Sequence, residues 1–70
     1  MPYINVKITR EGVTDEQKGQ LIQGITDLVV SILNKNPSTT FVVIEEIAME
    51  NWGIGGLPVE EYRSLSKASS

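Results

Sequence analysis

One long helical pattern between two strand patterns constrains the fold of this chain more than any other feature. Residues 3–9 alternate apolar and polar side chains, which is typical of a half-buried strand. Residues 41–47 begin with consecutive aromatic and β-branched side chains, which favours a strand covered on both faces. The helical stripe between them comprises Leu21, Ile22, Ile25, Leu28, Val29, Ile32 and Leu33. The pattern predicts a single β-α-β unit whose right-handed crossover makes the two strands parallel.

Both ends of the predicted helix carry recognisable signals. At the start, Thr14 and Gln17 have the spacing of a capping box, in which each side chain bonds the other residue's backbone N–H. At the end, Asn34 tolerates a left-handed cap, and Pro37 cannot continue the helical hydrogen bonds.

The segment after the second strand is expected to form a short C-terminal hairpin or arm. Residues 53–56 read Gly-Ile-Gly-Gly, and this glycine density indicates positive φ angles or close backbone approach. Pro58 is expected to start a last helical turn or two. Four serines between residues 64 and 70 favour a flexible tail there. The sequence therefore predicts one domain over residues 1–63 and a tail over residues 64–70.

A chain of 70 residues has too small a core to be stable alone, and it lacks the residues for the disulfides or Cys/His metal sites that usually stabilise such small domains. It contains neither cysteine nor histidine, which excludes disulfides, Cys/His zinc sites and a Ser-His or Cys-His catalytic pair. One helix covers one face of a two-stranded sheet, and both sheet edges stay unpaired. We therefore expect an α/β (α+β) homo-oligomer with subunit-shared sheets, and any pocket between subunits.

The charge balance excludes two classes of partner. Six basic residues face nine acidic ones, which gives a net charge of -3. No clustered basic face for nucleic acid or an anionic membrane can be built from so few cations. The first ten residues lack the apolar core of a signal peptide, and no stretch approaches the roughly 20 apolar residues of a membrane span. The sequence predicts a cytoplasmic protein.

Pro2 is the candidate proton-transfer residue. Without histidine, the α-amino group is the remaining group that titrates near neutrality, with a pKa of about 7.7–8.0. The small side chain at position 2 favours removal of Met1, which would expose a secondary amine on Pro2. Loss of water at the start of a strand entering a core would lower the pKa of this amine and make it a base at neutral pH. The plainer interpretation is a proline tolerated at the first position of a strand.

Three features together resemble the 4-oxalocrotonate tautomerase family over roughly residues 2–56. They are Pro2 at the start of a β-α-β unit of this size, the run Glu16-Gln17-Lys18, and the segment Asn51-Trp52-Gly53-Ile54-Gly55-Gly56. The resemblance implies a small homo-oligomer, often a hexamer. In that family the amino-terminal proline moves a proton between carbon and oxygen of an enol or keto acid, with no metal or cofactor. The resemblance also implies that Pro2 is the general acid/base and that Trp52 is the aromatic residue of the pocket.

The sequence departs from the family pattern at two binding positions. Family members that act on dicarboxylates place one arginine directly after the loop glycine and another at the start of the second strand, where this chain has Val13 and Phe41. One extra residue also stands between Pro2 and Gly12. These differences indicate a pocket more apolar than a dicarboxylate site.

Arg10 is the candidate replacement for a missing arginine. A guanidinium matches a carboxylate in shape and charge, and Arg10 and Arg63 are the two arginines of the chain. The hypothesis is that Arg10 binds substrate. The alternative is a solvated residue at a strand end, paired with Glu11.

Three functions follow from these residues. The first is a cofactor-free tautomerase or isomerase that interconverts enol and keto forms of a small 2-hydroxy-dienoate or α-keto acid, with Pro2 as general acid/base. The second is a lyase or a hydrolytic, dehalogenase-like enzyme, in which charged Pro2 acts as an acid and Glu50 activates water. The third is a catalytically silent homo-oligomeric assembly module, which a retained Met1 would favour.

Overall fold

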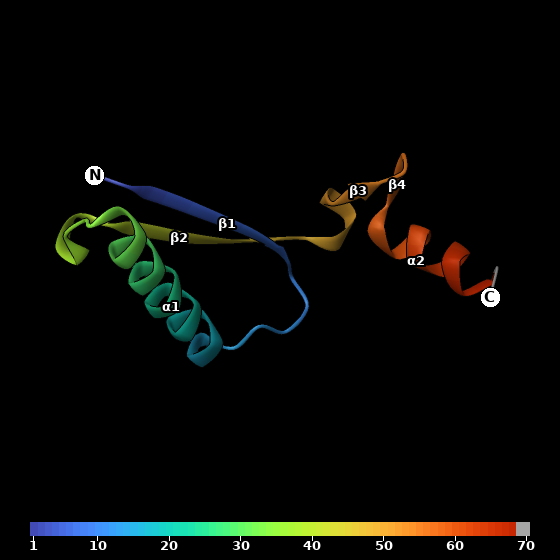
Figure 1. The fold of residues 1–70 in the computed structure, drawn as a ribbon. Coiled ribbons are helices and arrows are strands. Elements are labelled where there is room, and N and C mark those ends of the chain that lie inside the picture. Colours follow the sequence, from blue (N-terminus) through green and yellow to red (C-terminus); the bar gives the residue numbers. More distant parts are fainter. Residues whose placement is uncertain (69–70) are drawn as a thin grey trace.

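The computed structural model describes residues 1–68 and shows one β-α-β unit followed by an arm (Figure 1). In chain order the elements are β1 (Tyr3–Thr9), α1 (Asp15–Leu33), η1 (Pro37–Thr39), β2 (Phe41–Ile47), η2 (Met49–Asn51), β3 (Gly53–Ile54), β4 (Leu57–Pro58) and α2 (Val59–Ala68). The predicted strand, helix, strand and hairpin are therefore confirmed. None of the helices in the described part of the chain combines the length and apolarity that crossing a membrane requires.

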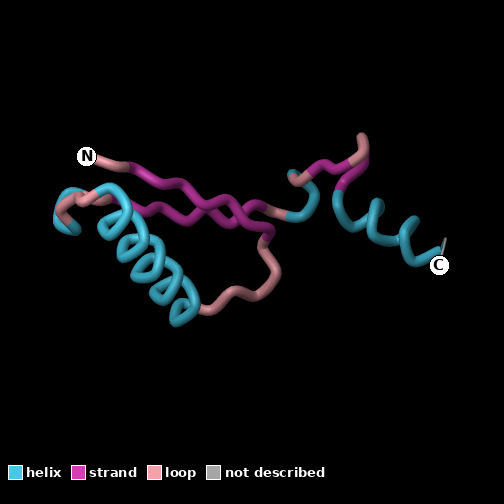
Figure 2. Tube along the Cα trace, viewed as in Figure 1, coloured by secondary structure: helices cyan, strands magenta, loops and turns pink. Residues whose placement is uncertain are grey.

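The two long strands form a parallel pair, as the crossover rule predicts. The register runs from Tyr3 opposite Phe41 to Thr9 opposite Ile47. Helix α1 lies against one face of this pair, and no element of residues 1–68 covers the opposite face (Figure 2). The sequence predicts that strand β2 is covered on both faces, but the described part of its own chain covers only one of them.

The pleat gives these two faces different chemistry. Adjacent residues Glu45 and Glu46 point to opposite sides, as strand geometry requires. Glu46 bonds Lys18 of α1, whereas Glu45 accepts a hydrogen bond from Asn5 Nδ2 at 2.7 Å and lies 3.6 Å from Lys7 Nζ. The helix side therefore holds Ile4, Val6, Ile8, Val42, Ile44 and Glu46, and the open side holds Tyr3, Asn5, Lys7, Phe41, Val43 and Glu45.

The predicted helix caps are confirmed. Thr14 Oγ1 accepts from the backbone N–H of Gln17 at 3.1 Å, and Gln17 Oε1 accepts from the backbone N–H of Thr14 at 3.0 Å. Asn34 caps the other end with φ of 53° in the left-handed region. These caps fix where the loop after β1 ends and where the chain turns back toward β2.

The arm begins with a two-residue hairpin loop. Gly55 and Gly56 have φ of 61° and 84°, and positive φ at both central positions is the requirement of a type I′ turn. A Cβ at Gly55 would also meet the Tyr62 ring at 3.1 Å. The hairpin closes onto α2 because the Val59 N–H donates to the Trp52 carbonyl at 2.8 Å.

Helix α2 differs from the predicted tail. It continues to Ala68, so the boundary predicted at residue 63 falls inside a helix. Serine costs less than about 1 kcal/mol in a helix, and Glu60 and Glu61 in the first turn favour the helix dipole. The serines are therefore too weak a signal to end the helix at residue 63. The last two residues of the predicted tail, 69 and 70, lie outside the described part.

A single chain has almost no core of its own. Its radius of gyration is 16.1 Å, whereas a compact domain of this length has about 11 Å. Among residues whose side chains the structure describes, Val59 alone is buried, with 6% exposure. Large apolar side chains exposed on the β-α-β unit include Leu21, Ile22, Leu28, Ile32, Leu33, Phe41 and Val43. The oligomer predicted from the sequence would supply the missing core.

Candidate active site

Pro2 and Arg10 lie at opposite ends of β1. The Pro2 carbonyl accepts a hydrogen bond from the Phe41 N–H at 2.9 Å, at the start of the strand pair. The Arg10 N–H donates to the Ile47 carbonyl at 2.8 Å, at the other end. Because a strand rises about 3.3 Å per residue, the two residues are roughly 26 Å apart. One chain alone therefore does not bring these candidate residues together.

Pro2 enters the sheet from an exposed end of the chain. Met1 is 84% exposed, whereas Pro2 is half-buried. The register pair that follows is Tyr3 and Phe41, whose aromatic side chains stand on the open side with exposures of 64% and 47%. Any layer that covers this face would also remove water from the neighbourhood of Pro2.

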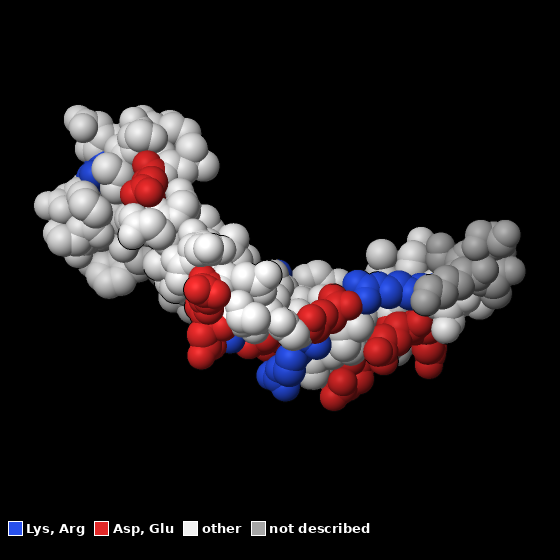
Figure 3. All heavy atoms as spheres, turned by 90° about the horizontal axis from the view of Figure 1, so that it is seen from below, with Lys and Arg blue, Asp and Glu red and all other residues white. Residues whose placement is uncertain are grey.

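The end of the molecule that holds Pro2 carries little charge. Between residues 28 and 44, Lys35 is the one charged residue. Seen from below, this end shows few charged side chains, while charges gather toward the arm (Figure 3, left and right). The surroundings of Pro2 are therefore mostly uncharged, which suits a site where an amine must lose water.

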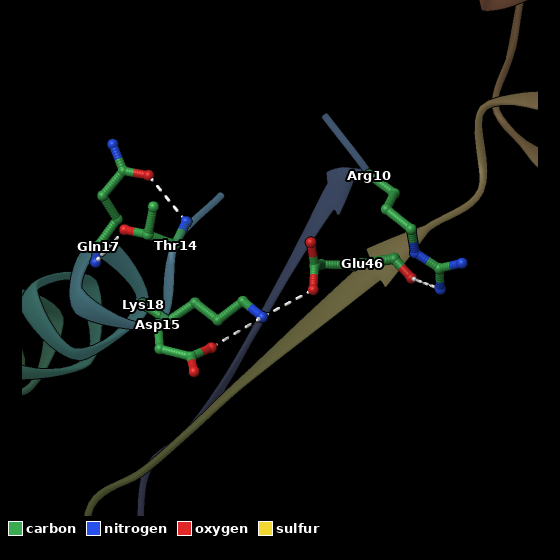
Figure 4. Close-up of polar contacts among 6 residues, drawn as sticks. All are labelled: Arg10, Thr14, Asp15, Gln17, Lys18 and Glu46. Carbon is green, nitrogen blue, oxygen red and sulfur yellow. Dashed lines mark hydrogen bonds and ion pairs between the residues drawn. The ribbon is translucent and has the colours of Figure 1, made fainter. Parts of the chain in front are cut away.

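Arg10 lies beside the end of β2. Its Nη2 donates to the backbone carbonyl of Glu46 at 3.4 Å, while the Glu46 carboxylate points away toward Lys18 (Figure 4). The Lys18 Nζ is 2.7 Å from that carboxylate and 3.8 Å from Asp15. The hydrogen bond from Lys18 lowers the pKa of Glu46, and the same bond raises the pKa of Lys18. Among the described residues Arg10 itself forms no ion pair.

Glu11 pairs with Arg63 rather than with Arg10, so the alternative partner expected for Arg10 is wrong. Arg63 Nη1 donates to Glu11 Oε1, and Arg63 Nη2 is 3.4 Å from Oε2. The Thr9 hydroxyl also donates to Oε2. The hydrogen bond from Arg63 is the main cause that lowers the pKa of Glu11, and it raises the pKa of Arg63. Both oxygens of this carboxylate are thus occupied.

Trp52 lies at the same end of the sheet as Arg10. It follows η2, is half-buried, and its backbone joins η2 to α2 through bonds to Met49 and Val59. Glu50, the candidate for water activation, stands exposed in η2. Both residues are therefore remote from Pro2 of the same chain.

The two positions at which the family resemblance implies arginines are also separated. Phe41 stands next to the Pro2 end, and its N–H is the one bonded to Pro2. Val13 lies in the loop after β1, where it helps to line a groove of about 550 Å³ along α1 with Leu21, Ile25 and Leu28. Both positions are apolar, as the sequence shows.

Comparison with known proteins decides the family. The chain matches the family described as "Tautomerase enzyme" over residues 2–62. The chain belongs to the tautomerase family. It is 57% identical over 63 residues to "Probable tautomerase K2" of Dickeya dadantii, which covers 90% of this chain and 94% of that protein. This tautomerase is a 4-oxalocrotonate tautomerase-like isomerase.

Solved structures show the same fold. The crystal structure of DmpI from Helicobacter pylori matches with a TM-score of 0.84 and 46% identity, over 90% of this chain and 97% of that one. The apo structure of the unfused 4-oxalocrotonate tautomerase matches with a TM-score of 0.81 and 34% identity, over 87% and 98%. The tautomerase fold of the chain is therefore shown by relatives that it covers almost completely.

Sequence reasoning missed the ion pairs of the tautomerase around Arg10. Glu11 and Arg63 are 52 residues apart, and Lys18 and Glu46 are 28 apart. No local spacing signals such pairs, because they form only when the loop, the arm and β2 meet. Within residues 1–68, His, Cys, Asp and Glu form no group of three or more that could hold a metal ion.

Proposed function

We propose that this tautomerase interconverts the enol and keto forms of a small 2-hydroxy-dienoate or α-keto acid, with Pro2 as the general acid/base. The observation that carries the proposal is the place of Pro2 directly before β1, half-buried next to Tyr3 and hydrogen-bonded through its carbonyl to Phe41, in a chain of this family. The reaction needs no cofactor, because a proton leaves one atom of the substrate and returns to another.

Removal of Met1 would leave Pro2 with a secondary amine. In the neutral form this amine takes the proton of the enol hydroxyl, so that the O–H bond breaks and an N–H bond forms. The electron pair moves through the conjugated system, the carbonyl forms, and Pro2 returns the proton to carbon. Loss of water around the amine keeps part of it neutral at neutral pH, because desolvation disfavours the charged form.

The proposed site is shared between copies of the chain. Arg10 and Trp52 lie at the end of the sheet opposite Pro2, about 26 Å away along β1. A substrate held by Pro2 and Arg10 together therefore contacts two chains. The exposed apolar side chains and unpaired strand edges of the single chain support such assembly, and we propose a homo-oligomer, with a hexamer as the expected size.

An enol-to-keto assay with phenylenolpyruvate tests this function. The Pro2→Ala variant is expected to lose about 100-fold or more in kcat, since positioned proton transfer contributes about 10²–10⁴-fold. Pro37→Ala, a change at an exposed proline in η1, is the control and should turn over normally.

Mass spectrometry of the same preparations checks that Met1 is removed. Comparable turnover by the wild type and Pro2→Ala would show that a residue other than Pro2 is the general acid/base. Retained Met1 with no turnover would favour the assembly module, and halide release from a halogenated acrylate, assayed separately, would favour the dehalogenase-like alternative.

A further inference from the structure

Two acidic residues neighbour Arg10, and a different cation holds the carboxylate of each. Glu11 follows Arg10 in the chain, and Glu46 is the residue whose backbone carbonyl Arg10 contacts. Glu46 is occupied by Lys18 at 2.7 Å, and Glu11 is occupied by Arg63 through both of its oxygens. The Arg10 guanidinium thus forms no ion pair of its own among the described residues, although, after the hydrogen bond from Lys18, its charge also contributes to the lowered pKa of Glu46.

Glu11 is, beside Glu46, a potential competitor for Arg10 among the described residues. The two residues are neighbours in the loop that leaves β1, so the carboxylate is tethered at high effective concentration near the guanidinium. A guanidinium bound to an internal carboxylate cannot offer the same two N–H donors to a substrate carboxylate. Free Arg10 therefore depends on what holds Glu11.

Helix α2 is built to hold Glu11. Val59, the buried residue of the arm, stands four positions before Arg63, so both lie on one face of the helix. The bond from the Val59 N–H to the Trp52 carbonyl at 2.8 Å fixes the start of the helix. From this face Arg63 reaches Glu11, and the Thr9 hydroxyl holds the same carboxylate from the strand side.

We propose that Arg63 is a positioning residue for substrate binding: it withdraws Glu11 from Arg10 and leaves one guanidinium for one substrate carboxylate. The role of Arg10 here rests on the function proposed above. One guanidinium without an ion pair matches one substrate carboxylate, because Lys18 and Arg63 are already paired with Glu46 and Glu11. The substrate class is therefore a monocarboxylate enol or keto acid.

Kinetics of three variants with phenylenolpyruvate test the proposal. Arg63→Gln is expected to raise KM about tenfold with little change in kcat, because Glu11 then competes for Arg10. Glu11→Gln should keep KM at or below the wild-type value. The double variant should return to the Glu11→Gln value, since the competitor is gone.

If the Glu11–Arg63 pair only stabilises the fold, the variants should show a different kinetic pattern. In that case Glu11→Gln, Arg63→Gln and the double variant all lose the same contact and are impaired alike, which would overturn the proposal. Lys35→Gln and Glu61→Gln match the charge changes at exposed positions away from Glu11, and both should behave as the wild type.

A second readout does not depend on turnover. In ¹⁵N spectra the Arg10 Nε–H signal should shift in Arg63→Gln and return in the double variant, because Glu11 moves onto Arg10 and is then removed. An unchanged signal in Arg63→Gln overturns the inference. The expected shifts in a protein that turns over no enol would support the role of Arg63 and overturn the proposed function instead.

Discussion

The Arg10 side chain makes few contacts with the rest of its own chain. Its guanidinium makes one long hydrogen bond, of 3.4 Å, to a backbone carbonyl. A residue with so little intramolecular contact contributes little to stability, and surface changes of this kind usually stay within about 0.5 kcal/mol. The charge is thus available for a ligand.

Replacing Arg10 by alanine separates binding from folding. We expect kcat/KM for an acidic enol to fall roughly 10- to 100-fold, through a higher KM, because the charge-assisted contact to the substrate carboxylate is lost. Denaturant unfolding of the same variant should match the wild type. Arg10→Lys keeps the charge without the planar fork and should recover part of the loss. An unchanged kcat/KM in Arg10→Ala would remove this residue from the site.

At the scale of elements, the Lys18–Glu46 pair ties α1 to β2. The pKa of Glu46 is lowered in the folded chain, chiefly by the hydrogen bond from Lys18. A lowered carboxyl pKa adds stability above the ordinary value of about 4.3, and this stability is lost as the pH falls through the folded-state pKa. The raised pKa of Lys18 acts in the opposite range, since its contribution is lost only at alkaline pH.

Acid unfolding of Glu46→Gln measures this contribution. The variant should be less stable than the wild type at neutral pH, and its stability should depend less on pH below about 4.3 because one titrating carboxylate is gone. Thermal midpoints between neutral pH and pH about 3 give the comparison. Glu16→Gln, the same change at an exposed residue of α1, is the control. Parallel curves for the wild type and Glu46→Gln would contradict the prediction.

The sequence predicts the elements well because their signals are local. The capping residues Thr14 and Gln17, the left-handed Asn34 and the paired glycines of the hairpin each act over a few positions, and each is found where expected. The signal for a tail after residue 63 is weaker, since helix α2 continues past this position through serines that resist a helix only weakly.

The candidate site is harder to predict, because it depends on contacts between distant segments. Pro2 and Trp52 are visible in the sequence as residue types, but their roles stay predictions. Strand length alone places Pro2 and Arg10 at opposite ends of β1, which the alternating pattern already implies. The contact of Arg63 with Glu11 is invisible until the arm folds back on the loop.

The single chain is elongated and does not form a compact globule. It measures 48 × 23 × 21 Å, and its accessible surface of 5235 Å² exceeds the about 4300 Å² of a compact protein of this mass. The arm reaches away from the β-α-β unit (Figure 1). Such a shape buries surface only by packing on other copies, and it separates Pro2 from Arg10 within each copy.

Replacing Leu28 by lysine tests whether assembly and catalysis depend on one another. Leu28 lines the apolar groove along α1 and is 59% exposed in the single chain. The substitution should therefore leave the helix intact while placing a charge where another copy must pack. We expect smaller species in sedimentation velocity, together with loss of turnover, because Pro2 and Arg10 of different copies no longer meet. Gln23→Lys adds the same charge to α1 at an exposed polar position and should assemble normally; an assembled, active Leu28→Lys would show that this groove is not a contact between copies.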